Sequence, residues 1–78
     1  MIELFKEAVL SVDLPESGLG ERNVGVVVEI YDNHKGYEVE FMTKEGRTVA
    51  VETLMAGQVR AIGEKDMWHV RELSEGVL

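Results

Sequence analysis

Hydrophobic and polar residues alternate along most of this chain, in short runs separated by clusters of turn-forming residues. Runs of four to eight residues with a period of two are typical of β-strands with one buried face. The pattern predicts about five strands, at residues 8–12, 24–31, 37–41, 47–53 and 58–62. Most of the apolar residues in these runs are β-branched or aromatic, which also favours strands over helices.

The alternation predicts which side chains face the core. In the third strand, Glu38 and Glu40 are expected to point outward, and the apolar residues around them inward. In the fourth strand, Val49 and Val51 are expected on the core face, with Glu52 outward. In the second strand, the residues that we expect to share the core face are the β-branched ones at alternate positions, Val24, Val26, Val28 and Ile30.

The connections are short, with one exception. Residues 13–23 form a long loop with the only proline, and its leucines, Leu14 and Leu19, predict that it folds back onto the strands. Gly46 suits a turn residue with positive φ, and Gly25 marks a point where a strand bends or another backbone comes close. Residues 54–57 are short enough for a single 3₁₀ turn before the last strand.

This layout predicts an all-β fold, a small SH3-like antiparallel barrel of about five strands. The core is expected over residues 4–62, with a C-terminal extension over 63–78. Within that extension, residues 67–73 fit either a short strand or a short helix. The length of 78 residues leaves room for one domain only, spanning 1–78.

Composition excludes several functions. With 15 acidic and 8 basic residues the formal net charge is −7, and no two bases are adjacent, so nothing predicts binding to nucleic acid. No apolar run has the length of a membrane span, so no membrane partner is expected. Cysteine is absent, which excludes disulfides and thiolate-bound metals and favours a cytoplasmic protein.

Several stretches resemble a known family. Gly25-Val26-Val27, directly after a polar loop end, is similar to the strand start of KOW-type SH3-like barrels. Over residues 4–73 the chain resembles a family of small bacterial proteins classed as a domain of unknown function. The stretches that carry this resemblance are Asp13-Leu14-Pro15, Val24-Gly25-Val26-Val27-Val28-Glu29, Tyr37-Glu38-Val39-Glu40-Phe41, Thr48-Val49-Ala50-Val51 with Thr53-Leu54, and Gln58-Val59-Arg60.

The resemblance implies the SH3-like fold but no chemistry and no functional residues. Members of the family often stand beside genes of toxin or nuclease type, which implies an antitoxin or accessory role.

The candidate binding residues fall into two groups. Glu38, Glu40 and Glu52 are expected to point outward from neighbouring strands, and Glu29 could join them. Such carboxylates suit a cation, an acid–base pair or a basic partner, and they also suit a merely solvated face. Among the binding roles we rank the basic partner first, because neither a spaced oxygen-rich loop nor a deep pocket is predicted.

The second group is the apolar end of the chain, where Met67 and Trp68 are typical interface residues. They are expected either to pack on this chain's own barrel or to contact a second copy or another protein. The only histidines, His34 and His69, are too few for a metal site, and turn composition explains His34. No nucleophile motif occurs, so we expect neither an enzyme nor a cofactor.

The sequence thus predicts a non-catalytic, acidic protein-interaction module that binds a basic protein partner through Glu38, Glu40, Glu52, Met67 and Trp68. An antitoxin-like role is its most specific form, and self-association through the C-terminal tail is an alternative to a separate partner. Two other functions stay open: an accessory or assembly subunit of an enzyme, and a KOW-like binder of RNA or of the ribosome.

Overall fold

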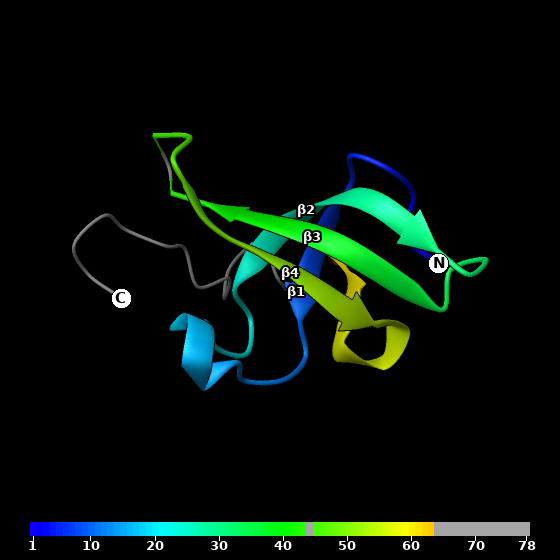
Figure 1. Cartoon of the computed structure of the whole chain (residues 1–78), viewed down its shortest axis with the longest axis horizontal. Coiled ribbons are helices and arrows are strands. Elements are labelled where there is room, and N and C mark those ends of the chain that lie inside the picture. The colour runs from blue at the N-terminus through cyan, green and yellow to red at the C-terminus, as the bar shows by residue number, and fades with distance from the viewer. Residues whose placement is uncertain (44, 64–78) are drawn as a thin grey trace.

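The computed structural model of the chain describes residues 1–43 and 45–63 (Figure 1). Its elements follow in the order β1 (Glu7–Leu10), η1 (Pro15–Ser17), β2 (Val24–Tyr31), β3 (Gly36–Met42), β4 (Thr48–Met55), η2 (Ala56–Gln58) and β5 (Val59–Ala61), where η marks a 3₁₀ helix. The all-β class and the five antiparallel strands predicted from the sequence are therefore confirmed. The expected C-terminal extension, from residue 64 on, lies outside the described residues.

The five strands form one sheet in the order β4-β3-β2-β1-β5. Figure 1 shows the long strands β2, β3 and β4 side by side, with β1 crossing behind them. The chain passes from β4 through the single turn of η2 into β5, so the two edges of the sheet are joined by a short connection. Among the described residues β4 and β5 are not paired, and the barrel-like sheet is therefore not closed by hydrogen bonds.

The core lies on one face of this sheet. Phe41, Val39 and Tyr37 of β3 are almost fully buried, as their alternation predicts. They belong to a single cluster, which consists of Ile2, Ala8, Leu10, Leu19, Val27, Tyr37, Val39, Phe41, Leu54 and Val59. Leu19 belongs to the loop over residues 13–23, and Leu14 packs against the same cluster, so the loop does fold back onto the sheet.

The predicted face of β2 is wrong for its first half. Val27, not Val26, is buried, because Val27 lies opposite the core residue Val39. The pairing with β3 then shifts between Val27 and Glu29, so that Val28 is the extra residue of a β-bulge. After the bulge Ile30 packs against the core, as expected, while Val24 and Val26 lie on the opposite face.

The predicted face of β4 is confirmed for Val49 but wrong for Val51 and Glu52. Ala50 lies opposite Phe41 and packs against the core, whereas Val51 is half exposed. Glu52, expected outward, lies opposite the buried Val39 and therefore on the core side of the sheet. A second register shift, between Phe41 and Met42 of β3, lets Val49 also pack against the core.

Gly25 and Gly46 behave as predicted. Gly46 has φ of +87° in the turn between β3 and β4, a conformation that glycine adopts without steric cost. At Gly25 a Cβ atom would lie only 2.7 Å from the carbonyl oxygen of Glu40, so the close backbone approach requires a residue without a side chain.

Candidate functional site

The outer face, by which we mean the side of β2, β3 and β4 that points away from the core, carries both acidic and apolar side chains. The register between these strands places ten residues on it: Val24, Val26, Glu29, Tyr31, Gly36, Glu38, Glu40, Val51, Thr53 and Met55. The bulge at Val28 has a direct consequence here, because it moves Glu29 to the outer face.

Three glutamates form an acidic row on this face. Glu29 lies directly opposite Glu38 on the neighbouring strand, and Glu40 follows on the same side of β3. Like charges that face each other across two strands repel and destabilise the sheet. The acidic row therefore costs stability that uncharged polar residues would not cost, which points to a role other than folding.

Hydroxyl groups orient two of these carboxylates. The Tyr31 hydroxyl donates to Glu38 Oε1 over 3.0 Å, and the Thr53 hydroxyl donates to the same oxygen over 3.5 Å. The Thr48 hydroxyl donates to Glu40 Oε2 over 2.6 Å. Because each donor is a neutral hydroxyl, these bonds position the carboxylates without neutralising their charge.

The acidic row also acts on Tyr31. The hydrogen bond to Glu38, the desolvation of the phenol and the negative charges of Glu38 and Glu29 together raise the pKa of Tyr31 above its ordinary value of 10.0. The acidic row thus favours the protonated phenol, which is the form that donates to Glu38.

Exposed apolar side chains accompany the acidic row. Val51 is 50% exposed on β4, next to Glu40, and Met55 is 67% exposed at the end of the same strand. Tyr31 and Met55 both lie opposite Gly36, so they flank a position with no side chain. An exposed surface that combines oriented charges with apolar contact area is typical of protein-binding faces.

The structure brings together only part of the predicted site. Glu38 and Glu40 lie on the same face, and Glu29 joins them. Glu52 does not, because its side chain is on the core side, where the Ser17 hydroxyl of η1 donates to Glu52 Oε2. Met67 and Trp68 lie outside the described residues.

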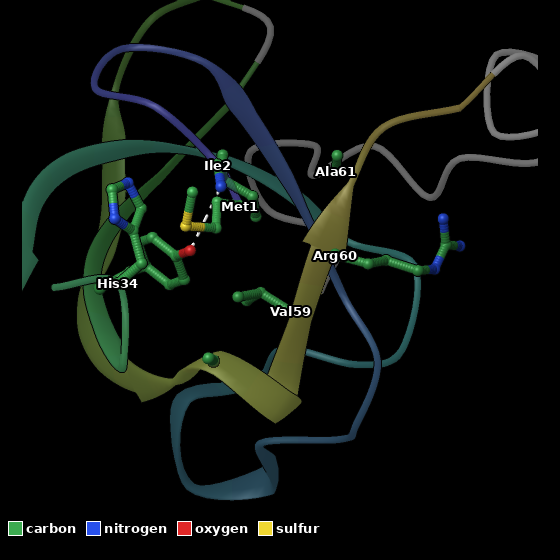
Figure 2. A pocket seen from close by; sticks show the side chains of 8 residues that line it. Met1, Ile2, His34, Val59, Arg60 and Ala61 are labelled. Carbon is green, nitrogen blue, oxygen red and sulfur yellow. Dashed lines mark hydrogen bonds between the residues drawn. The ribbon is translucent and has the colours of Figure 1, made fainter.

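A pocket beside the β2–β3 turn is a feature that the sequence did not predict. Its volume is about 320 Å³, and it is lined by the N-terminal segment, the β2–β3 turn, β3, η2 and β5. Its lining residues are Met1, Ile2, His34, Tyr37, Ala56, Val59, Arg60 and Ala61. The His34 ring lies edge-on to the Tyr37 phenol, with 6.0 Å between the ring centroids. Figure 2 shows that the Arg60 side chain extends away from His34. The walls are therefore mainly apolar.

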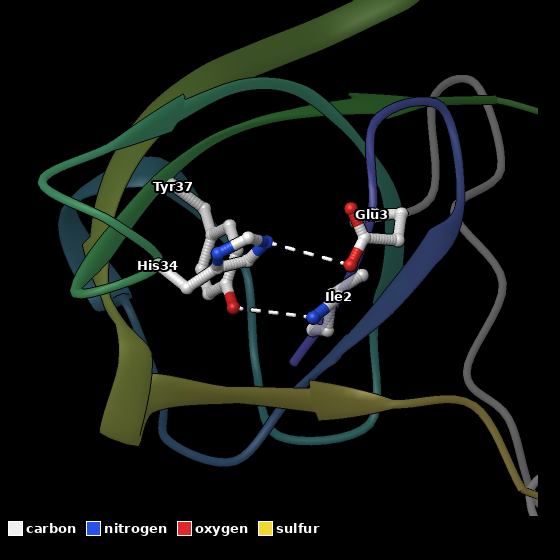
Figure 3. A network of polar contacts seen from close by, with 4 residues as sticks. All are labelled: Ile2, Glu3, His34 and Tyr37. Atoms are coloured by element: carbon white, nitrogen blue, oxygen red, sulfur yellow. Dashed lines mark hydrogen bonds and ion pairs between the residues drawn. The ribbon is translucent and has the colours of Figure 1, made fainter.

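The polar contacts beside this pocket hold the N-terminal segment in place (Figure 3). The buried backbone N–H of Ile2 donates to the Tyr37 hydroxyl over 3.2 Å. His34 Nε2 lies 3.5 Å from a carboxylate oxygen of Glu3, close enough for an ion pair when the imidazole is protonated. That contact lacks hydrogen-bond geometry, and neither imidazole nitrogen has a hydrogen-bond partner among the described residues. The hydrogen bond from Ile2 to Tyr37 therefore holds the N-terminal segment against β3, with Glu3 beside His34.

The part of the chain that the structure describes contains no cluster of three or more His, Cys, Asp or Glu side chains that could hold a metal ion. Within the same residues, no helix is long and apolar enough to span a membrane.

Comparison with known proteins gives one match. A family model described as a domain of unknown function (DUF4926) matches residues 4–61, so the resemblance seen in the sequence is confirmed over most of its expected length. No curated protein matches the chain, and no solved structure does.

Proposed function

This chain belongs to the DUF4926 family, a domain of unknown function, and from that premise and its own outer face we propose that it is a non-catalytic module that binds a basic protein partner. Glu38 and Glu40, with Glu29 in place of the expected Glu52, would steer the partner and pair with its Lys or Arg side chains. The exposed Val51 and Met55 would supply apolar contact area beside these charges.

The acidic row is the observation that carries this proposal. Three carboxylates on adjacent strands repel one another, and yet hydroxyl groups hold two of them in fixed orientations. A basic partner would turn that repulsion into attraction, and carboxylates that are already oriented would lose little side-chain entropy on binding. The same surface disfavours RNA, because phosphates would meet negative charges.

The scaffold supports an SH3-like assignment. In the sheet β1 lies between β2 and β5, and a 3₁₀ turn leads from β4 into β5, as in the layout expected for that fold. Small barrels of this kind present binding surfaces on a rigid sheet rather than deep catalytic clefts. We expect the partner to be a toxin-like basic enzyme. We place the interaction in the cytoplasm, because the absence of cysteine fits that compartment. Met67 and Trp68 stay sequence predictions for additional anchors.

A pull-down with matched charge variants tests this function. The tagged chain is compared with Glu38→Lys/Glu40→Lys, which reverses two charges of the acidic row, and with Glu16→Lys/Glu21→Lys. The second variant makes the same change of net charge at two exposed positions of the loop over residues 13–23. We expect a stoichiometric basic partner on the unmodified chain and on the loop variant, and its loss from the acidic-row variant.

The captured complex also separates the possible roles. If the chain inhibits the partner's enzymatic activity, the antitoxin-like role holds, whereas a partner that is active only in the complex indicates an assembly subunit. Binding should weaken steeply between low and physiological salt, because screening shortens the range of charge attraction. Equal capture by both charge variants, with no dependence on salt, would contradict the proposal.

A further inference from the structure

Strand β4 has an open edge. It pairs with β3 on one side, and among the described residues nothing pairs with its other side, so β4 ends the sheet there (Figure 1). The opposite end of the sheet is β5, which has only three residues. β4 has eight residues and is therefore the long edge of this sheet.

The register identifies the backbone groups at this edge. The Ala56 N–H donates to the Lys35 carbonyl over 3.0 Å, so these residues form a hydrogen-bonded pair. In an antiparallel pair such positions alternate with non-bonded ones. Counting back from Ala56, Leu54 and Glu52 face β3, whereas the N–H and C=O groups of Met55, Thr53 and Val51 point to the open edge.

One contact supports this assignment independently. The Met55 N–H donates to the Gln58 side-chain oxygen over 2.8 Å, which it can do only by pointing away from β3. η2 therefore covers the last edge donor of β4. The edge amides of Val51 and Thr53 receive no such cover from the described residues, and they form the central part of the strand.

This edge carries only part of the usual protection against pairing. Natural edge strands are blocked by Pro, by Lys on the edge, by a short length, by β-bulges or by inward-pointing charged residues. β4 reads Thr-Val-Ala-Val-Glu-Thr-Leu-Met and has neither Pro nor Lys. Its register shift lies near its start, and its one inward-pointing charge, Glu52, accepts a hydrogen bond from Ser17. Val and Thr are also among the residues that best favour a β-strand.

We propose that β4 binds an extended basic segment of the partner as an additional strand of the sheet. This inference rests on the proposed function and specifies how its partner binds. Backbone groups of Val51 and Thr53 would bond to the incoming strand, while Lys or Arg at alternate positions would lie on the outer face. The incoming strand would lie two strand spacings, or about 10 Å, from Glu38 and Glu40 on β3.

A long basic side chain spans that distance across the exposed side chain of Val51. Its methylene groups would cover the half-exposed valine, and its charge would reach the acidic row beyond it. Charge also selects against a second copy of this chain, because pairing β4 with itself would bring two acidic rows together on molecules of net charge −7.

Amide hydrogen exchange of the full chain tests the proposal. The probe is a short synthetic peptide in which Lys alternates with Val and Thr, and its control is the same peptide with Glu in place of Lys. We expect the Lys peptide to slow exchange at Val51 and Thr53 by about tenfold or more at saturation. Exchange at Glu52 and Leu54 should change little, because their amides already bond to β3, and the Glu peptide should have no effect.

Two variants sharpen the test. Val51→Pro removes an edge donor while it leaves the bonds to β3, and it should weaken binding of the Lys peptide by about tenfold or more. Val51→Thr keeps the donor and the β-branched shape but loses one methyl group of the contact surface, so it should weaken binding far less than Val51→Pro does. If Val51→Pro does not fold, the exchange measurement on the unmodified chain still decides the question.

The outcomes separate this inference from the proposed function. If Glu38→Lys/Glu40→Lys abolishes binding of the Lys peptide, but exchange at Val51 and Thr53 never changes, strand addition is overturned and the acidic face stands as the binding site. If neither peptide binds while the captured partner still requires Glu38 and Glu40, strand addition is again overturned. Edge protection that rises with protein concentration, without peptide, would replace the basic segment by a second copy of the chain.

Discussion

Substitution of Gly25 by alanine should destabilise the fold more than so small a change suggests. A Cβ atom at this position would lie 2.6 Å from Val39 Cγ1, 2.7 Å from the carbonyl oxygen of Glu40 and 2.9 Å from Phe41 Cδ1. The two side chains can shift slightly, but the carbonyl belongs to β3, which is held between β2 and β4. The sheet itself must therefore move, and overpacking of this kind costs about 1–3 kcal/mol.

That cost is large for so small a domain. A chain of 78 residues has a free energy of unfolding of about 4–12 kcal/mol. Alanine also restricts the unfolded chain, which returns about 0.4–1 kcal/mol and leaves a net loss of about 1.3 kcal/mol at the middle of the two ranges. For a domain of this size, such a loss lowers Tm by about 5–10 °C. Urea unfolding followed by circular dichroism, with a thermal scan, measures both quantities.

Gly57→Ala is the matched control. A Cβ atom at Gly57 would meet no atom within 4 Å, and Gly57 is not among the residues with positive φ. This substitution should therefore raise the free energy of unfolding by about 0.4–1 kcal/mol, through the unfolded state alone. If Gly25→Ala also left stability unchanged or raised it, the close approach of β2 to β3, and the packing built on it, would be refuted.

Three further predictions concern single residues. Tyr37→Phe leaves the buried N–H of Ile2 without its acceptor and should cost about 1–3 kcal/mol in urea unfolding, whereas no change would show that water replaces the hydroxyl. Glu38→Gln should lower the pKa of Tyr31 toward its ordinary 10.0, which an ultraviolet titration measures. Because a raised phenol pKa stabilises the fold below pH 10 and this stability is lost at higher pH, Glu38→Gln should also reduce the loss of stability above pH 10. Arg22 has φ of +76°, so Arg22→Gly should stabilise the chain by about 0.5–1 kcal/mol, and a lower Tm would mean that its side chain contributes more than its backbone costs.

The strands could be predicted from the sequence because each is a short apolar run between turn-forming residues. The bounds of β2, Val24–Tyr31, agree with the prediction at both ends, and the long loop folds back through Leu14 and Leu19 as expected. These features depend on local patterning, which a single sequence carries. The close approach at Gly25 was predictable for the same reason, because a glycine inside a strand weakens it and is typical of a bend or a close backbone contact.

The faces of β2 and β4 could not be predicted in full, because alternation cannot reveal where a bulge breaks the register. Val24 to Val28 is apolar on both faces, so the pattern fits either orientation. In β4 the decisive residue is Leu54, which lies in the core and extends the strand beyond its predicted end. Alternation counted back from Leu54 puts Ala50 inward and Val51 outward, as the structure has them.

The contact between Glu3 and His34 could not be predicted, for a different reason. These residues lie far apart in the sequence, and the folded chain brings the N-terminal segment to the β2–β3 turn. The turn itself carried a partial signal. Asp32, Asn33 and His34 all have positive φ, and Asp and Asn are the non-glycine residues that tolerate this conformation best. Nothing in the pattern indicated what His34 would face.

The bulge at Val28 links the core of this protein to its proposed binding face. If β2 alternated without interruption after Val27, Ile30 would leave the core and Glu29 would point into it. The extra residue, Val28, reverses both effects: it returns Ile30 to the core and places Glu29 opposite Glu38. Burial of Ile30 thus stabilises the arrangement that holds two like charges together. The packing beneath the acidic row thus offsets the repulsion within it, and Glu38 and Glu40 on β3 lie one strand away from the open edge of β4.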